Sequence, residues 1–346
     1  MLCVGRCGIT FATMKNGAIG ISVLVLALGC SLPYLVRAQE SRGTGLKTYS
    51  KSAKKTEPAR APTFGAVLLG GHGSVDEATR FLCDHSGGGD IVVLSASGRG
   101  EYNDEVHNAC PANSVTTFVI TSEKGARTPI VAEKLRNAHA IFFSGGDQSN
   151  YLKYWSGTPV QDEINNAVAR GVPVGGISAG LAIQGEFVFA AFVDTVTSPE
   201  ALANPYNPRV TLEREFLKIP VLKEVITDSH FSARERMGRT VVFMSRIVQD
   251  GWAEVAHGIG IDETTAVLVN ADGTATVVGK NAAYFMTLNR RPERCLPGEP
   301  LTVRDIDVYR LPAGAASKFD LKSWSGTNGS SFKVNVIDGK MSRTDQ

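Results

Sequence analysis

The sequence predicts an α/β fold with a doubly wound, mostly parallel sheet and helices on both faces. Short runs rich in valine, isoleucine and phenylalanine recur between residues 64 and 176 without polar alternation. Such runs are typical of strands that are buried on both faces of a sheet. Longer mixed segments separate them, and most are long enough for a helix that connects two parallel strands.

The expected elements follow one another regularly in the first half of the chain. The apolar runs predict strands at 64–71, 90–97, 114–120, 140–146 and 172–176. The segments between them predict helices at 75–83, 103–110, 130–137 and 160–170. Together they describe repeated strand–helix units, which build a parallel sheet.

The second half of the pattern is less regular. A further helix is expected at 236–249, and strands are expected at 266–270, 274–279, 282–288 and 305–311. Asp272 and Gly273 form a typical hairpin turn between two of these strands. We expect these later strands to extend the same sheet as an antiparallel C-terminal extension.

Residues 1–38 have the layout of a secretory signal peptide. Lys15 provides a basic n-region, and an apolar run from Ala18 to Leu28 follows it. Small residues at 36 and 38 have the spacing of a cleavage site. The run is shorter than the about 20 residues of a spanning helix, so we expect a secreted or periplasmic protein with no membrane span after cleavage. Lipoprotein anchoring at Cys30 is the weaker alternative, because Ala27 replaces the expected leucine.

The rest of the chain divides into three expected segments. Residues 39–62 have few large apolar groups, a composition typical of a disordered linker. Residues 63–315 contain the predicted elements and form the expected folded domain. Residues 316–346 are polar, which predicts a C-terminal tail.

Charge and cysteine content narrow the classes of function. The chain has a formal net charge of +2, and residues 1–38 hold three positive charges and no acid, so the rest carries −1. That balance does not favour nucleic acid as a partner. Cys83, Cys110 and Cys295 lack the spacing of a metal site. An oxidising compartment would permit a disulfide between Cys83 and Cys110, and three buried thiols are the alternative.

Residues 176–180, Gly-Ile-Ser-Ala-Gly, place Ser178 between two glycines after a predicted strand. This pattern is typical of a nucleophile elbow, a turn so sharp that neighbouring side chains would collide. A helix beginning at Ala179 would direct its N–H groups toward the site. Tight packing of a strand against a helix, with Ser178 as a small residue, is the alternative.

A serine nucleophile requires a base and an acid that orients the base. His230 has the most informative setting of the six histidines, and Asp228, Asp262 and Glu263 are candidate acids. A second glycine turn after the strand at 140–146 would line the same crevice as Ser178. The N–H groups of Gly146 and Ala179 would then bind an oxyanion, although an ordinary tight turn also explains Gly146.

Arg236 and Arg239 are three residues apart and lie on one face if their segment is helical. A guanidinium binds a carboxylate through two parallel hydrogen bonds, so the two arginines are candidates for binding a free carboxylate of a substrate. An ion-pair network with Asp228, Glu235 or Glu254 is the alternative.

Four segments resemble the signature regions of the cyanophycinase branch of peptidase family S51, relatives of aspartyl dipeptidase. They are "FFSGGDQ", "GISAGLA", "DSHFSARERMGR" and "GIGIDETTA", in this order. The resemblance covers roughly residues 64 to 311. It implies a class I glutamine amidotransferase-like sheet and a serine exopeptidase acting next to aspartyl residues, including β-aspartyl-arginine linkages. It also implies Ser178 as nucleophile, His230 as base and Glu263 as acid.

The resemblance further implies oxyanion donors and a substrate pocket. The donors would be Gly146 and Ala179, and the substrate contacts would be Gln148, Asp228, Ser229, Arg234, Arg236 and Arg239. The expected partner is a small peptide or a cyanophycin-like polymer, a homodimer is left open, and neither a metal nor an organic cofactor is required. Ser229 and Ile177 stand where cyanophycinases usually have Gln and Thr, which places cyanophycin itself in question as the substrate.

Two other functions share parts of this pattern. An α/β-hydrolase esterase also uses a Gly-x-Ser-x-Gly motif, but it orders its triad serine, acid, histidine, and here nearly ninety residues follow His257 without another histidine. A binding module without catalysis would retain the glycine turns for architecture alone.

Overall fold

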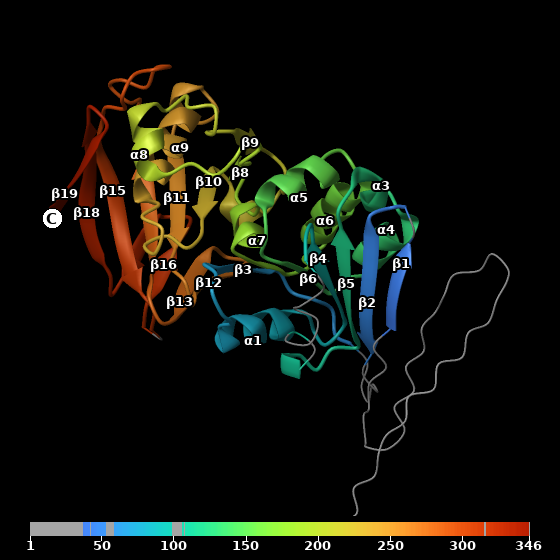
Figure 1. Ribbon diagram of the computed structural model, residues 1–346. Helices are drawn as coiled ribbons and strands as arrows, with labels where there is room; N and C mark the ends of the chain where they lie inside the picture. Colours follow the sequence, from blue (N-terminus) through green and yellow to red (C-terminus); the bar gives the residue numbers. More distant parts are fainter. Residues whose placement is uncertain are drawn as a thin grey trace, which may run out of the picture.

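The computed structural model describes residues 37–41, 43–52, 59–98, 106, 108–314 and 316–345. Within these residues the strands form two sheets that lie side by side in Figure 1, one of eleven strands and one of eight. Cys30 and the predicted leader up to residue 36 lie outside the described residues.

The centre of the first sheet is parallel, as the sequence predicts. Its strands are β3 (Gly65–Leu69), β4 (Asp90–Ser95), β5 (Ser114–Ile120), β6 (Ala140–Phe143) and β7 (Val174–Ile177). They lie in the order β5, β4, β6, β7, β3, and each neighbouring pair is parallel. Both faces of these strands are buried, which explains why they lack polar alternation.

Helices cover both faces of this sheet (Figure 1). One face carries α1 (Asp76–His85), whose apolar residues share a core with alternate strand residues. The other face carries α3 (Glu123–Ala126), α4 (Pro129–Arg136), α5 (Gln148–Trp155) and α6 (Pro159–Ala169). The doubly wound arrangement is therefore confirmed. Residues 103–105 and 107 of the helix predicted at 103–110 lie outside the described residues.

The predicted hairpin at Asp272 and Gly273 is confirmed. It joins β12 (Thr265–Asn270) to β13 (Thr274–Gly279). The Asp272 carboxylate accepts a hydrogen bond from the Thr274 N–H at 2.9 Å, and Gly273 has a φ of 92°, which favours glycine. β12 pairs antiparallel with β3, so this hairpin extends the first sheet as expected.

The prediction of one continuous sheet is wrong for the strands that follow. β14 (Ala282–Leu288) and β15 (Val303–Pro312) pair with β11 (Ala256–Ile261) in a second sheet. β14 contributes Phe285 to the core of the first sheet and Met286 to a second core. Because both faces of β14 are apolar, the strand is buried only when a layer packs on each side of it.

The second sheet has its own helices and its own core. Its remaining strands are β8 (Phe187–Phe189), β9 (Leu212–Arg214) and β10 (Val225–Asp228), followed at the far edge by β18 (Ser330–Ile337) and β19 (Lys340–Asp345). α8 (Ser198–Ala203) and α9 (Met237–Gln249) pack against it, and the short helix η1 (Pro220–Leu222) precedes β10. β10 is parallel to β8 and β11. Its carboxyl end, which leads to His230, lies toward the centre of the molecule (Figure 1).

The prediction of a disordered linker at 39–62 is wrong for residues 46–52. β2 (Leu46–Ser52) pairs antiparallel with β5 along its whole length, and β1 (Arg37–Ser41) pairs with β2. Leu46 is buried, and the Ser50 hydroxyl donates to the Thr116 hydroxyl at 3.3 Å. Backbone hydrogen bonds to the edge of a formed sheet stabilise this polar segment, although it has little apolar surface to bury.

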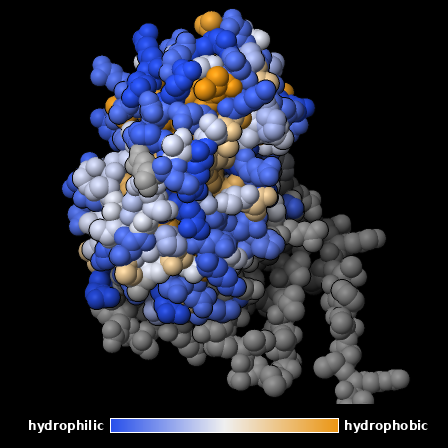
Figure 2. Space-filling view, turned by 90° about the vertical axis from the view of Figure 1, so that its left-hand side faces the viewer, coloured by the Kyte–Doolittle hydropathy of each residue, from blue (hydrophilic) through white to orange (hydrophobic). Residues whose placement is uncertain are grey.

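The prediction of a C-terminal tail at 316–346 is also wrong. β16 (Lys318–Asp320) and β17 (Ser325–Thr327) close one edge of the first sheet, while β18 and β19 close one edge of the second. Phe319 stacks on Phe285 with ring centroids 3.8 Å apart, so this segment covers the core between the sheets. The side of the molecule where β18 and β19 lie has a mostly hydrophilic surface with small apolar areas (Figure 2).

Cys83 and Cys110 form a disulfide with their Cα atoms 5.2 Å apart. Cys295 is a free, buried thiol, and burial raises its pKa to about 12. Of the two cysteine states that the sequence left open, the structure has the disulfide. In the part of the chain that the structure describes, no helix has the length and apolar character needed to cross a membrane.

Candidate active site

Ser178 lies on a strained turn between β7 and the short helix α7 (Ala179–Ala182). Its φ of 56° and ψ of −112° are uncommon for a residue with a side chain. A Cβ at Gly176 would collide with the carbonyl oxygen of Gly180, and a Cβ at Gly180 would collide with that of Phe143. Both glycines of the Gly-x-Ser-x-Gly motif are therefore required by the turn, which lifts Ser178 to the carboxyl end of the sheet.

His230 follows β10 and faces Ser178. Its Nε2 atom lies 2.8 Å from the Ser178 hydroxyl oxygen. The His230 backbone has a φ of 47°, and its N–H donates to the carbonyl oxygen of Gly70 at 2.8 Å. A Cβ at Gly71 would lie 2.6 Å from Nε2, so the loop after β3 approaches the imidazole as closely as only glycine allows.

Glu263 completes the chain of contacts from the loop between β11 and β12. Its Oε1 atom lies 2.7 Å from His230 Nδ1. The Glu263 carbonyl oxygen accepts hydrogen bonds from the Asn281 amide at 2.8 Å and from the Thr265 hydroxyl at 3.1 Å. These bonds fix the loop, so the carboxylate is held against His230. Asp262, a competing candidate acid, instead accepts from the Ser232 N–H at 2.9 Å.

The charges of this group suit a neutral base beside an ionised acid. Burial lowers the pKa of His230, and the nearby charges of Arg234 and Arg236 act in the same direction against the hydrogen bond with Glu263. The hydrogen bond with His230 lowers the pKa of Glu263. An ionised carboxylate only accepts hydrogen bonds, so Nδ1 donates to it. Nε2 is then the basic atom and accepts from the Ser178 hydroxyl.

The two proposed oxyanion donors come from neighbouring strand ends. Ala179 is the first residue of α7, where a helical N–H has no partner within its own helix. Gly146 lies in the loop after β6 with a φ of 138°, and a Cβ there would collide with the Ser97 hydroxyl. Because Gly180 packs on the last carbonyl groups of β6, the start of α7 lies against this loop.

Asp228 is the centre of a buried ion-pair cluster. Its carboxylate accepts from Arg239 Nε at 2.7 Å and Nη2 at 2.6 Å, and from Arg236 Nη1 at 3.1 Å. Burial alone would raise the pKa of Asp228, but the charges of Arg239 and Arg236 outweigh it and lower that pKa. The ion-pair alternative considered for the two arginines is therefore present, and Asp228 holds both guanidinium groups in place.

A cavity of about 460 Å³ opens beside these arginines. Gln148, Arg234, Arg236 and Arg239 lie on its wall, together with the Gly146 loop and residues 191–197. Arg239 is only 3% exposed and also donates to the Thr195 hydroxyl at 3.1 Å. Arg234 is exposed, and within the described residues it forms no ion pair. The cavity thus offers Arg234 and the outer edge of Arg236 to an anionic group.

Asp228 and Ser229 do not reach the cavity wall, in contrast to the substrate contact that we predicted for them. Each is 3% exposed. The Ser229 carbonyl oxygen accepts from Arg236 Nη1 at 2.8 Å. Their polar atoms therefore support the arginines from behind, and their influence on a substrate would be exerted through Arg236.

Comparison with known proteins identifies the family of the chain. The model of peptidase family S51 matches residues 95–277, which is more than half of the chain. The chain belongs to peptidase family S51. This family membership, together with the relatives below, identifies it as a serine-type peptidase and argues against the α/β-hydrolase esterase and the non-catalytic module.

Several relatives of this S51 peptidase carry the name cyanophycinase. The chain is 26% identical over 294 residues to the cyanophycinase of Trichormus variabilis, which covers 80% of this chain and 92% of the relative. It is 31% identical over 155 residues to that of Geminocystis herdmanii, covering 44% of this chain and 51% of the relative. The crystal structure of a peptidase from an acI-B1 Actinobacterium has the same fold, with a TM-score of 0.53, 17% identity, and coverage of 75% and 98% of the two chains.

Sequence reasoning missed two parts of the site in this S51 peptidase. Gly71 was not among the expected site residues, whereas it packs on the imidazole of His230. Residues 191–197 and Lys153 on the cavity wall carried no motif at all. Gly70 and Gly71 follow the first strand of the parallel sheet. Because ligands bind at the carboxyl ends of such strands, this glycine pair could have predicted that the loop belongs to the site.

Proposed function

We propose that this S51 peptidase hydrolyses aspartyl or β-aspartyl peptide bonds through a Ser178–His230–Glu263 triad. The observation that carries the proposal is the continuous hydrogen-bonded chain from the Ser178 hydroxyl through His230 to Glu263, beside an arginine-lined cavity. The relatives named cyanophycinase support an aspartyl-type substrate.

Acylation begins when His230 Nε2 takes the proton of the Ser178 hydroxyl. The serine oxygen attacks the carbonyl carbon of the scissile bond, and the carbonyl electron pair moves onto oxygen. The N–H groups of Gly146 and Ala179 donate to that oxyanion, and each such donor stabilises a transition state by about 2.7–4 kcal/mol. Glu263 stabilises the imidazolium ion that forms.

The imidazolium ion then returns its proton to the leaving amine as the carbon–nitrogen bond breaks. The acyl group remains on Ser178 as an ester. A water molecule gives a proton to His230 and attacks the ester carbonyl, and the proton passes to Ser178 when the acid product leaves. These steps require one base, and His230 serves in both halves because it is neutral at the start of each.

The arginines define the side of the site that binds the aspartyl residue. In a β-aspartyl peptide the α-carboxylate is free and lies close to the scissile carbonyl. Arg236, held by Asp228 and Ser229, has a second terminal nitrogen for that carboxylate, and Arg234 adds an exposed guanidinium. Hydrogen bonds from guanidinium groups to a carboxylate are stronger than neutral hydrogen bonds, and two of them from different arginines fix the substrate orientation.

Secretion is part of the same proposal. The signal-peptide layout of residues 1–38 supports it, and so does the disulfide between Cys83 and Cys110, since disulfides persist in oxidising compartments. Expression of the full chain should yield an exported product that begins near Gln39 by mass spectrometry. A product that stays in the cytoplasm with residues 1–38 attached would contradict secretion.

Covalent labelling and a peptide panel test the catalytic proposal. A fluorophosphonate probe should label the wild type, and Ser178→Ala should abolish both labelling and hydrolysis, lowering kcat by about 10⁴-fold or more. Ser232→Ala is the matched control, because Ser232 is an exposed serine near His230 and should retain both. Mass spectrometry of products from α- and β-aspartyl dipeptides identifies the linkage. Peptidase activity that survives Ser178→Ala would refute the triad.

A further inference from the structure

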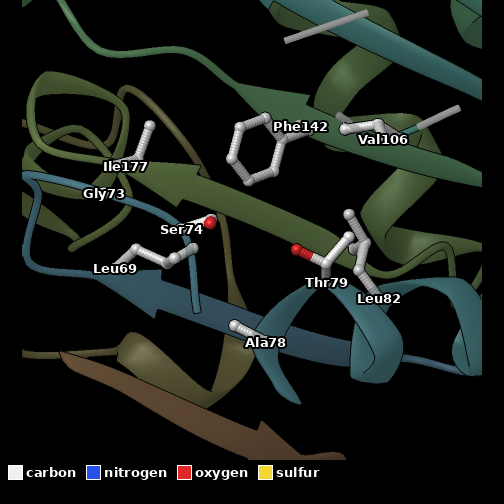
Figure 3. Close-up of a pocket in the computed structure, with 9 residues that line it drawn as sticks. All are labelled: Leu69, Gly73, Ser74, Ala78, Thr79, Leu82, Val106, Phe142 and Ile177. Carbon is white, nitrogen blue, oxygen red and sulfur yellow. The ribbon is translucent and has the colours of Figure 1, made fainter. Parts of the chain in front are cut away.

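A second cavity, of about 170 Å³, lies on the opposite face of the sheet from the arginines. Figure 3 shows its side chains around the space between α1 and the ends of β3 and β7. The wall includes Leu69, Phe142 and Ile177 on the sheet side. Ala78, Thr79 and Leu82 of α1 lie on the other side, and Gly73, Ser74 and Val106 complete the described lining. We infer that this cavity binds the side chain of the residue that leaves in the reaction, and that this side chain is apolar. The inference rests on the proposed function.

The position of the cavity connects it to the nucleophile. Ile177 immediately precedes Ser178, and it pairs in parallel register with Leu69. Gly73, which also lies on the wall, belongs to the loop in which Gly71 packs against His230. One end of the cavity is therefore formed by the two segments that hold Ser178 and His230.

The two cavities lie on the two faces of the sheet, one beside the strand end that leads to Ser178 and the other beside the loop of Gly146. Ile177, Leu69 and Phe142 share the core on the α1 face. Phe143, the next residue of β6, points into the core of the other face, and the chain leads from there to Gly146 on the arginine-lined cavity. A substrate that is cleaved at Ser178 with its aspartyl carboxylate on Arg234 and Arg236 extends its leaving residue toward the α1 face.

The chemistry of the second cavity selects an apolar side chain. Among the described residues that line it, none is charged, and the polar groups are the hydroxyls of Ser74 and Thr79. Asp76 and Glu77, the acids at the start of α1, are exposed and do not lie on its wall. An arginine guanidinium placed here would lose its water without gaining a carboxylate from the described lining residues, which is unfavourable. A leucine or valine side chain gains from leaving water.

A panel of β-aspartyl dipeptides that differ in the leaving residue tests this inference. We expect kcat/KM for β-Asp-Leu to exceed that for β-Asp-Ala and for β-Asp-Arg by at least about tenfold, since each methylene in an apolar pocket changes kcat/KM by about 10- to 200-fold. Thr79→Phe, which fills the cavity, should lower kcat/KM for β-Asp-Leu by at least about tenfold. A larger loss for β-Asp-Leu than for β-Asp-Ala, at an unchanged urea midpoint, distinguishes a filled subsite from a misfolded variant.

Glu77→Phe is the matched control, because it places the same ring on the solvent side of the same helix. It should leave the ratio of β-Asp-Leu to β-Asp-Ala unchanged. Equal or faster cleavage of β-Asp-Arg, or a Leu preference that survives Thr79→Phe, would overturn the apolar subsite and leave the proposed function standing. If Ser178 is labelled by the probe but none of the dipeptides is cleaved, the β-aspartyl proposal fails and the subsite assignment fails with it.

Discussion

Replacing Asp228 by alanine tests whether the buried cluster supports the arginine-lined cavity. The Asp228 carboxylate accepts five hydrogen bonds, two of them from Arg239 and one from Arg236. Asp228→Ala removes all five and leaves Arg239, which is 3% exposed, without its counter-ion. The perturbation therefore creates a buried cation with no opposite charge in contact.

The expected loss of stability is about 3–5 kcal/mol, the usual cost of removing one partner from a buried ion pair. Arg239 keeps its bonds to Thr195 and Val196 and its packing over the Phe189 ring, which favours the lower end of that range. The lowered pKa of Asp228 means that its contribution is fully present above its ordinary pKa and is lost as pH falls through the lower value of the folded state. The full effect is thus expected at neutral pH.

Urea unfolding at pH 7 measures this effect, and KM for a β-aspartyl dipeptide measures its consequence for binding. Glu123→Ala is the control, because its ion pair with Arg127 is exposed on both sides and should contribute at most about 1 kcal/mol. The structural account would be refuted if Asp228→Ala unfolded within about 1 kcal/mol of the wild type. A raised KM with unchanged stability would instead indicate a direct substrate contact.

Three further predictions concern the triad and the disulfide. Gly71→Ala should lower kcat by more than about 100-fold, because its Cβ displaces the His230 ring, and it should also destabilise the fold by about 1–3 kcal/mol, because a φ of 113° is unfavourable for alanine. The activity of the wild type should fall on acidification with a midpoint below pH 6.5, since burial lowers the pKa of His230. Glu263→Gln should move this midpoint to still lower pH, because it removes an interaction that raises the same pKa. A wild-type midpoint above pH 6.5 would contradict the assignment of His230 as the base. The Cys83→Ser/Cys110→Ser double variant should unfold about 3.5 kcal/mol more easily, for a loop with a sequence separation of 27, and equal urea midpoints for variant and wild type would refute it.

The parts of the fold that the sequence predicted best are the strands that are buried on both faces of the sheet and therefore consist of apolar residues. The central parallel strands follow from such runs, and the helices at 130–137 and 160–170 follow from the mixed segments between them. The structure places these elements within a few residues of the prediction. β2 was missed because its stability comes from backbone hydrogen bonds to β5 and not from its own composition. β18 did carry a signal, since buried residues alternate with more exposed ones along it, but the polar segments around it hid that period.

The catalytic residues were predictable for a different reason than the walls of the two cavities. Ser178 lies in a turn whose unusual backbone leaves a mark in the sequence, because glycine is required at 176 and 180, where another chain segment approaches too closely for a Cβ. His230 and Glu263 were assigned through the resemblance of their segments to family S51. The cavity walls need only side chains of suitable size and charge, and many residues meet that need. The second cavity can therefore be recognised only in the folded structure, where Ile177, Thr79 and Phe142 come together. The preference for a leaving residue then depends on how these side chains pack and not on a sequence motif.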